Sequence, residues 1–332
     1  MKKIKAVGLL SGGLDSTLAA ELLKEQGIEI IALNFKSPFC LCDQKGKCYS
    51  AETAKKLGLK YRTMQKGKEY LKLLRNPKHG YGRAMNPCID CRIFILKKAK
   101  KFAKGIGAKF IFTGEVLGQR PMSQHFHALR LIEKEAGLEG KLLRPLSAKL
   151  LPETEAEKKH WVSREKLLSL QGRQRKPQFE LAKKFSVKDY PCPSGGCLLT
   201  YNEFAAKLKD LFESKKSVSA IDIELLKIGR HFRFGKSKII AGRNSLENSR
   251  LLFLKNKSDF VFEVKGLGSP IVLLQGAKTK KPVETAAQIA LHYSDCKTPE
   301  AEVECRAGAK KIKKVLVRQI SEAEIEKMRI IK

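Results

Sequence analysis

Short apolar runs and helix-like patterns take turns along the first third of the chain. Residues 4–10 and 28–35 are apolar runs that predict buried strands, and a helical pattern over residues 18–26 lies between them. A strand, a helix and a second strand in this order make a βαβ unit, whose strands are parallel. The pattern continues with helices at residues 50–58 and 91–104 and strands at residues 60–64 and 109–113. This part of the chain is predicted to be an α/β domain with an open parallel sheet.

The pattern is less regular after residue 113. We expect helices at residues 161–170 and 201–212, separated by a basic turn at residues 171–177 and by a segment rich in Pro and Gly that excludes helix at residues 191–197. Strands are expected near residues 230–234, 237–242, 260–264, 271–274 and 312–318, with a helix at residues 283–293. A boundary near residues 214–219 then divides the chain into domains at residues 1–212 and 215–332, the second a smaller α+β domain.

The charge of the chain indicates a polyanionic partner. The sequence has 67 Lys and Arg against 34 Asp and Glu, a formal net charge of +33. Nucleic acid is the natural candidate, because each phosphate that a basic side chain neutralises releases a counterion. The hydrophobic share of 42% excludes a wholly disordered basic protein. The sequence contains neither an apolar run long enough to span a bilayer nor a signal peptide, so the expected location is the cytoplasm.

A glycine loop follows the first predicted strand and opens the first helix. In Ser11-Gly12-Gly13-Leu14-Asp15-Ser16, two glycines allow a tight turn that brings backbone N–H groups to a phosphate at the helix N-terminus. The loop lacks the Gly-Lys-Ser/Thr of a Walker loop. It resembles the PP-loop of the ATP pyrophosphatase family, whose members split ATP into AMP and pyrophosphate and have a HUP-like fold.

The resemblance implies a nucleotide site at this loop. It assigns the pyrophosphate end of ATP to Ser11, Gly12, Gly13, Ser16 and Thr17. It also gives Asp15 the role of placing Mg²⁺ or orienting the loop. Asn34 and Phe35, at the end of the second strand, would lie against adenine, although Phe35 fits an ordinary core position equally well.

Seven of the nine cysteines are grouped. They form the clusters Cys40-x-Cys42-x5-Cys48, Cys88-x-x-Cys91 and Cys192-x4-Cys197. In a reducing compartment such clusters indicate metal, iron–sulfur or redox sites rather than disulfides. Cys296 and Cys305 stand apart and fit buried thiols. Nothing in the sequence separates a second metal site from free thiols for Cys40, Cys42 and Cys48, and the role of Cys192 also stays open.

Two cysteine segments resemble the tRNA 2-thiouridylase family. These are Asn86-Pro87-Cys88-Ile89-Asp90-Cys91 and Pro193-Ser194-Gly195-Gly196-Cys197, and the resemblance implies that Cys91 and Cys197 do the sulfur chemistry. With Cys88 the chain has three thiolates, which match a [4Fe–4S] cluster with one open iron. The alternatives are a zinc site with Cys192 as fourth ligand, and a thiol pair that carries a persulfide and closes as a disulfide.

A third segment resembles a second family. Thr113-Gly114-Glu115-Val116-Leu117-Gly118-Gln119 continues to Arg120 and Ser123-Gln124, and Leu143-Arg144-Pro145-Leu146 follows. Both stretches are similar to tRNA 4-thiouridine synthases, which implies that Gly114 contacts ATP and Arg120 contacts RNA. The N-terminal RNA-capture domains of that family are not expected, because the phosphate loop begins at residue 11.

The C-terminal domain resembles the RNA-binding module of the NFACT family. The elements are Gly242-Arg243-Asn244 with Glu247-Asn248, and Asp259-Phe260-Val261-Phe262-Glu263-Val264-Lys265-Gly266. Five basic residues are close enough in the sequence to meet one phosphate backbone: Arg230, Arg233, Lys236, Lys238 and Arg243. Such a module could capture tRNA.

Together these features predict an ATP-dependent tRNA sulfurtransferase. It would adenylate a uridine carbonyl and replace its oxygen with sulfur from sulfide, a cysteine desulfurase or a persulfide carrier, with 4-thiouridine favoured over 2-thiouridine. Two alternatives stay open: an RNA-binding or quality-control factor with a vestigial nucleotide site, and a PP-loop enzyme that acts on a small molecule. The intact loop argues against the first, and the charge against the second.

Overall fold

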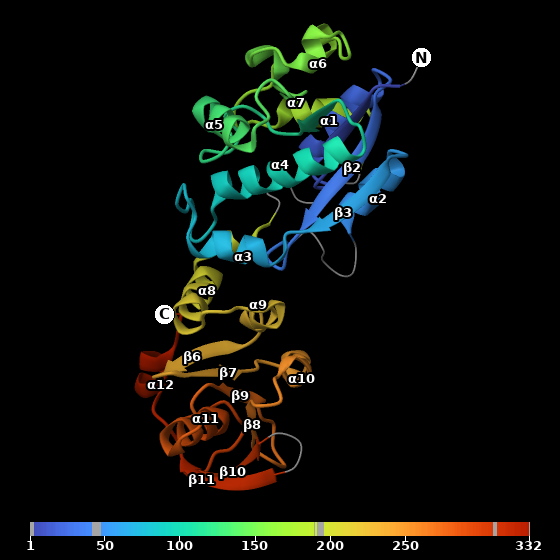
Figure 1. Ribbon diagram of the computed structural model, residues 1–332. Coiled ribbons are helices and arrows are strands. Elements are labelled where there is room, and N and C mark those ends of the chain that lie inside the picture. Colours follow the sequence, from blue (N-terminus) through green and yellow to red (C-terminus); the bar gives the residue numbers. More distant parts are fainter. Residues whose placement is uncertain (1–2, 42–47, 189, 191–195, 308–310, 332) are drawn as a thin grey trace. The chain divides into compact units, whose positions relative to one another are not determined.

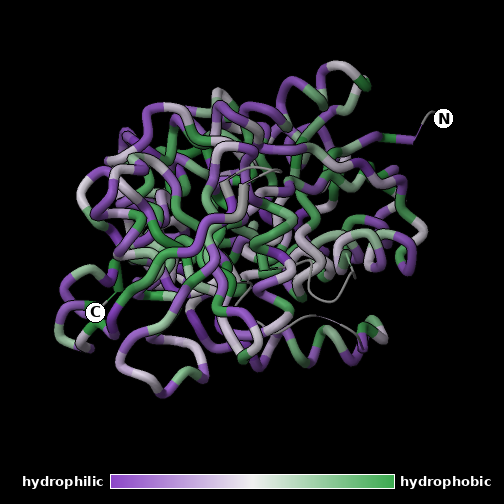
Figure 2. The backbone as a smooth tube through the Cα atoms, turned by 90° about the horizontal axis from the view of Figure 1, so that it is seen from below, coloured by the Kyte–Doolittle hydropathy of each residue, from purple (hydrophilic) through white to green (hydrophobic). Residues whose placement is uncertain are grey.

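The computed structural model describes residues 3–41, 48–188, 190, 196–307 and 311–331. The chain divides into two compact units, Met1–Tyr201 and Asn202–Lys332. The helix Asn202–Ser214 belongs to the second unit. The domain limits expected from the sequence, residues 212 and 215, lie at the end of this helix, and they stay a prediction. Hydrophilic stretches, purple in Figure 2, run along much of the backbone, in keeping with the excess of basic residues.

The first unit is built on a five-stranded parallel sheet in the order β3-β2-β1-β4-β5, of which Figure 1 labels β2 and β3. Its strands are β1 (Lys5–Leu9), β2 (Glu29–Lys36), β3 (Lys60–Gln65), β4 (Phe110–Thr113) and β5 (Leu142–Leu143). Every neighbouring pair is parallel. The expected open α/β sheet is therefore confirmed.

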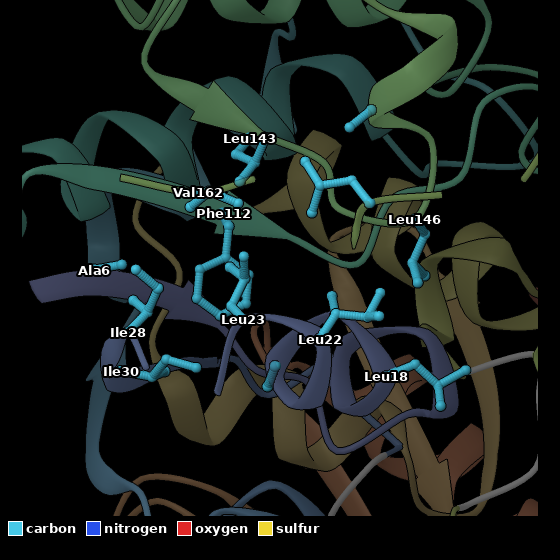
Figure 3. Packing of buried hydrophobic residues seen from close by; sticks show 14 of the residues in the cluster. Ala6, Leu18, Leu22, Leu23, Ile28, Ile30, Phe112, Leu143, Leu146 and Val162 are labelled. Atoms are coloured by element: carbon cyan, nitrogen blue, oxygen red, sulfur yellow. The ribbon is translucent and has the colours of Figure 1, made fainter. Parts of the chain in front are cut away.

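Helices cover both faces of this sheet. The helices of the first unit are α1 (Leu14–Lys24), α2 (Tyr49–Lys56), α3 (Gly67–Arg75), α4 (Cys88–Gly105), α5 (Phe126–Ala136), α6 (Glu155–Lys158) and α7 (Lys176–Lys184). One core cluster joins α1 and α7 to Ala6 and Phe112, and Figure 3 shows the Phe112 ring pointing from β4 toward Leu23. A second cluster joins α4 and α5 to Val7 and Ile111. Neighbouring residues of β1 and β4 alternate between the two clusters, which explains why Ala6, Val7, Ile111 and Phe112 are all apolar.

The helix expected at residues 161–170 is wrong. Only a 3₁₀ turn, Arg164–Lys166, forms there. Leu168 N donates to Pro145 O at 3.0 Å and Leu170 N donates to Leu146 O at 2.7 Å, so these backbone groups bond to a distant segment instead of to their own turn. Leu167 is buried in the α1 core cluster, which explains the apolar spacing that predicted a helix.

The second unit is a six-stranded antiparallel sheet with helices, as the expected α+β domain requires. Its order is β11-β10-β8-β9-β7-β6, and α11 packs on the core of buried residues beside it. The strands are β6 (Arg230–Phe234), β7 (Ser237–Ala241), β8 (Phe260–Glu263), β9 (Val272–Gln275), β10 (Glu300–Ala307) and β11 (Lys311–Arg318). The helices are α8 (Asn202–Ser214), α9 (Ala220–Leu226), α10 (Ser245–Leu254), α11 (Lys280–His292) and α12 (Glu322–Met328). Among the described residues of both units, no helix is long and apolar enough to cross a membrane.

A buried ion network ties the carboxyl ends of β4 and β5 to α4 and α5. The Arg144 guanidinium, 2% exposed, bonds to Glu133 of α5, and its Nε lies 3.1 Å from Glu115 Oε2. Arg92 Nε of α4 lies 3.3 Å from the other oxygen of Glu115. Burial raises the pKa of the Glu115 carboxyl, but the two arginines outweigh burial and hold this pKa below its ordinary value. Glu115 is thus charged, and it depends on these partners.

We expect Arg144→Met to lower the free energy of unfolding of the first unit by about 3–5 kcal/mol, because two buried carboxylates lose their main counter-charge. Urea unfolding followed by the fluorescence of Trp161 measures this, since the chain has a single tryptophan and it lies in the first unit. The matched control is Arg130→Met. Arg130 also contacts Glu133 but is 42% exposed, so its loss should stay below about 1 kcal/mol. Equal losses in the two variants would contradict the role given to Arg144.

Candidate functional site

The glycine loop joins β1 to α1 in a conformation that its own hydroxyl groups stabilise. Ser16 Oγ donates to Gly13 O at 2.8 Å, and Thr17 Oγ1 donates to the same oxygen at 3.1 Å. Gly12 has a φ of 79°, and a Cβ there would lie 2.6 Å from Ser50 N of α2. The loop therefore requires glycine at this position, both for its backbone angle and for the close approach of α2.

A cavity of about 610 Å³ opens over this loop at the carboxyl ends of the strands. Its volume is in the range of small-molecule sites. Of the residues expected at the nucleotide, it is lined by Ser11, Gly13, Asp15, Ser16, Phe35 and Gly114. Gly12, Thr17 and Asn34 are not among the residues that line it. Asn34 Nδ2 donates to Leu10 O at 2.8 Å and so joins the ends of β1 and β2.

Four arginines line the same cavity: Arg92, Arg120, Arg173 and Arg175. Arg175 Nη2 donates to Asp15 Oδ2 at 2.7 Å, and Gln119 Nε2 donates to the same oxygen at 3.2 Å. Burial lowers the pKa of the Arg120 guanidinium, and the nearby charge of Arg92 lowers it further. This concentration of positive charge suits an anion with several charges, such as a triphosphate.

The sequence offered only partial signals for these arginines. Arg120, expected at RNA, is exposed and also lines the cavity. Arg173 and Arg175 belong to the basic turn at residues 171–177, to which the sequence assigns no role. The turn reaches Asp15 across 160 residues of chain, and no local pattern encodes such a distance.

The two cysteine segments meet beside the cavity. Cys88 and Cys91 begin α4, and Cys197 precedes the 3₁₀ turn Leu198–Thr200. Burial raises the pKa of Tyr70, and negative charge on Cys91, Cys197 and Cys88 would raise it further, so the three thiols lie around one phenol. The positive charges of Arg92 and Arg120, which line the cavity, lower the pKa of the Cys88 thiol, although burial raises this pKa overall. Cys88 thus lies near two arginines of the cavity wall, although none of the three cysteines lines the cavity itself.

The three thiols differ in how readily they ionise. Burial raises the pKa of Cys91, but Lys66, whose Nζ lies 3.1 Å from Cys91 Sγ, and a hydrogen bond from Tyr70 hold this pKa below the ordinary thiol value. Burial raises the pKa of Cys197 to about 11, and burial also raises the pKa of Cys88. Cys91 is thus the thiol of the three that ionises most readily.

The other cysteines lie at several places. Cys40 stands opposite Cys197 in an antiparallel bridge. Cys48 Sγ lies 3.4 Å from Ser50 Oγ and 3.6 Å from Tyr61 OH, beside α2 and β3. Cys305 is buried in the second unit, and Cys296 contacts Thr298 there. Cys42 and Cys192 lie outside the described residues.

No three His, Cys, Asp or Glu side chains of the described residues are already arranged to hold a metal ion. Cys88, Cys91 and Cys197 nevertheless provide the thiol donors that an iron–sulfur cluster takes. The chemistry of the donor set fits such a cluster. The Lys66 ammonium, in contact with Cys91, would have to move away for Cys91 to bind iron.

Most of the basic residues expected at RNA have partners within the second unit. Arg233 donates through Nε and Nη2 to Asp210, both at 2.7 Å, and Arg243 bonds to Glu247. Arg230 lies over the ring of Tyr293 at 4.5 Å. Lys236 is exposed in the turn between β6 and β7. Lys236 and Arg243, whose side chain is 53% exposed, are therefore accessible to a phosphate, whereas Lys238 is buried against Asp210.

Two segments of the chain match known protein families. Residues 2–149 match the family described as thiamine biosynthesis protein (ThiI), and residues 229–329 match the NFACT protein RNA binding domain. The two matches correspond to the phosphate-loop unit and to the antiparallel sheet of the second unit.

Similar proteins include enzymes that place sulfur in tRNA. A probable tRNA sulfurtransferase of Thermococcus kodakarensis is 31% identical over 119 residues, which are 35% of this chain and 30% of that protein. The tRNA-specific 2-thiouridylase MnmA of Petrotoga mobilis is 34% identical over 134 residues, 35% of this chain and 36% of that protein. The chain thus spans about a third of the length of these relatives.

Among solved structures, a 4-thiouridine synthetase–RNA complex with bound ATP is similar with a TM-score of 0.36 and 22% identity. The superposition covers 67% of this chain and 52% of that one.

We expect Lys66→Met to slow the alkylation of Cys91 by iodoacetamide at pH 7 by about tenfold, because the loss of a neighbouring positive charge raises the pKa of this thiol and reduces its thiolate fraction. The midpoint of the rate against pH should move upward. Mass spectrometry of the peptide that carries Cys91 measures the rate. Lys66→Arg keeps the charge and serves as control. An unchanged rate in Lys66→Met would show that Lys66 does not activate Cys91.

Proposed function

We propose that this chain is an ATP-dependent tRNA sulfurtransferase that acts in the cytoplasm and replaces a uridine carbonyl oxygen with sulfur. The observation that carries the proposal is that two arginines connect the cavity to the cysteines. Arg92 and Arg120 line the cavity over the glycine loop, and their charges also lower the pKa of the Cys88 thiol. Activation by ATP and attack by sulfur require the ATP site and the sulfur carrier to be adjacent, because the two reactions occur on neighbouring atoms of one base.

The first step forms an adenylated base. The carbonyl oxygen of uridine attacks the α-phosphorus of ATP, and pyrophosphate leaves. Backbone N–H groups of the loop and the guanidinium groups of Arg173 and Arg175 offset the charge of the phosphates. Asp15, bonded to Arg175, is suited to orient this arginine or to place Mg²⁺ with ATP. Adenylation converts a poor oxygen leaving group into AMP.

The second step delivers sulfur. Cys91, held as a thiolate by Lys66, accepts a sulfane sulfur from a persulfide donor. The terminal sulfur of this persulfide attacks the activated carbon and AMP leaves, which gives a disulfide between the base and Cys91. Cys197 then attacks Cys91 Sγ. The thiolated base departs, and a Cys91–Cys197 disulfide is left on the protein.

A [4Fe–4S] cluster is the alternative sulfur carrier. Cys88, Cys91 and Cys197 would hold three of its irons, and the group would supply an open iron that can bind sulfide. A zinc ion would use the same thiols with a fourth ligand. In either case the arginines around the cavity keep the role of binding and orienting the nucleotide.

Capture of tRNA falls to the second unit in this proposal. Its match to an RNA-binding domain supports this role, and the net charge of +33 of the whole chain suits an RNA partner. The relatives do not distinguish which carbonyl of uridine is modified, because a probable tRNA sulfurtransferase and a 2-thiouridylase both match the first unit. The L-R-P-L and T-G-E segments favour 4-thiouridine.

We expect tRNA from a strain that lacks this gene to lose one thionucleoside, measured by nucleoside mass spectrometry. The wild-type gene should restore it, whereas Asp15→Asn and Cys91→Ser should each restore less than about 1% of it, because the first removes a charge from the nucleotide site and the second removes the nucleophile. Glu155→Gln, on the surface helix α6, is the control and should restore it fully. A strain with an unchanged set of thionucleosides would rule out tRNA thiolation and leave the small-molecule or RNA-quality-control alternatives.

Cys88→Ser separates the two sulfur carriers. Protein purified without oxygen should contain close to four irons per chain if a cluster forms, and the variant should then lose both iron and thiolation. The persulfide route predicts that the variant keeps thiolation, since it uses only Cys91 and Cys197. Iron analysis and single-turnover thiolation give the two readouts. Loss of thiolation in Cys88→Ser, when the active wild-type protein contains no iron, would contradict both carriers.

A further inference from the structure

Cys40 lies directly across from Cys197 on a neighbouring segment of backbone. The two residues are paired in an antiparallel bridge that connects the stretch after β2 to the stretch before the 3₁₀ turn Leu198–Thr200. Leu198 N donates to Phe39 O at 2.8 Å, and Leu41 N donates to Gly196 O at 3.0 Å. These bonds flank the cysteine pair on both sides and leave the pair itself without backbone bonds between its two members.

Cys40 and Cys197 form a non-hydrogen-bonded pair, the more closely spaced of the two kinds of pair in antiparallel strands. Residues opposite each other at such positions have Cα atoms about 4.5 Å apart, with side chains on the same face. Disulfides join Cα atoms that are about 4.4–6.8 Å apart. The backbone therefore already holds Cys40 and Cys197 at a separation that a disulfide can bridge.

The packing around the bridge keeps the two segments together. A Cβ on Gly196 would lie 2.5 Å from Leu41 Cδ1, so glycine is what allows the side chain of Leu41 to lie against this backbone. Phe39 is 1% exposed and its ring lies 6.3 Å from that of Tyr70. The segment that carries Cys40 is thus anchored to the phenol around which the other three thiols lie.

We propose that Cys40 is the resolving thiol of the sulfur site, which takes over the bond to Cys197 and so releases Cys91 for another turnover. This inference rests on the persulfide form of the proposed function. Cys91 lies at the first turn of α4 in contact with Lys66 and Tyr70, and Cys91 and Cys40 are both partly exposed. Exchange of the Cys91–Cys197 disulfide for a Cys40–Cys197 disulfide would therefore free Cys91 before an external reductant acts.

The exchange needs no oxidant beyond the reaction itself. The Cys40 thiolate attacks Cys197 Sγ of the Cys91–Cys197 disulfide, a bond forms between Cys40 and Cys197, and Cys91 leaves with its electron pair. The ammonium of Lys66, 3.1 Å from Cys91 Sγ, stabilises the departing charge. An external dithiol then reduces the Cys40–Cys197 disulfide and is itself oxidised, so atoms and electrons balance over the cycle.

The first experiment maps the disulfides of the full chain. Tryptic peptides 37–45 and 189–207 carry Cys40 and Cys197, and peptide 84–92 carries both Cys88 and Cys91, so fragmentation of the linked peptides identifies the bonded cysteine. Cys42→Ser and Cys192→Ser serve as a common background, because these cysteines share two of the peptides. The reduced protein is treated with one equivalent of diamide, alkylated and digested. Most of the linked Cys197 should be joined to Cys40. In the added variant Cys40→Ser it should be joined to peptide 84–92 instead, while Cys48→Ser should leave the pattern unchanged.

The second experiment separates this role from a structural one. With limiting dithiol, Cys40→Ser should complete the first turnover at the rate of the parent protein and then slow by about tenfold or more, and excess dithiothreitol should restore the later turnovers. A merely structural defect would slow the first turnover as well. Normal repeated turnover of Cys40→Ser would overturn the proposal, as would linkage of Cys197 mainly to Cys91 in the parent protein.

Failure of the proposed function looks different. In that case no variant, and not even the parent protein, forms thiouridine, whereas the diamide map still reports whether Cys40 and Cys197 pair.

Discussion

The buried charge of Glu115 is the constraint on which the site depends. This carboxylate is 2% exposed at the carboxyl end of β4, and a charge in such a place is tolerated only with positive partners. Arg144 comes to it from beyond β5, and Arg92 comes from α4. The two ion pairs of Glu115 thus hold the ends of β4 and β5 and helix α4 next to one another. Because Arg92 also lines the cavity over the glycine loop, the same pairing positions part of the cavity wall.

The arginines of the cavity and the cysteines of α4 lie at the same edge of the sheet because of its topology. The carboxyl ends of parallel strands lie on one side, so the loop after β1 and the segments that follow β2 and β4 converge there. The N-terminus of α4 then brings Cys88 and Cys91 to the same edge. Positive charge has a separate task on each side. Arginines favour the anionic phosphates, whereas the Lys66 ammonium favours the thiolate of Cys91.

The places where sequence reasoning failed show what a periodic pattern can and cannot report. The apolar spacing of residues 161–170 looks helical, but it reflects side chains packed under α1 while the backbone bonds to residues 145 and 146. Strand β10 was missed although Val303 and Cys305 are buried at alternate positions, because charged residues between them hide the signal. Helix α5 was missed as well, although Ala128, Leu129, Ile132 and Ala136 carry the buried face of a helix.

The sequence by itself determined the parallel sheet, the loop that opens α1 and the grouping of the cysteines, because each depends on residues close together in the chain. Only the tertiary structure decided which distant groups meet. Arg175 reaches Asp15 across 160 residues, Cys40 faces Cys197, and Asp210 takes up the charge of an arginine expected at RNA. The physical reason is that local spacing controls backbone conformation, whereas the pairing of charges and thiols depends on the path of the whole chain and on the burial that makes an unpaired charge costly.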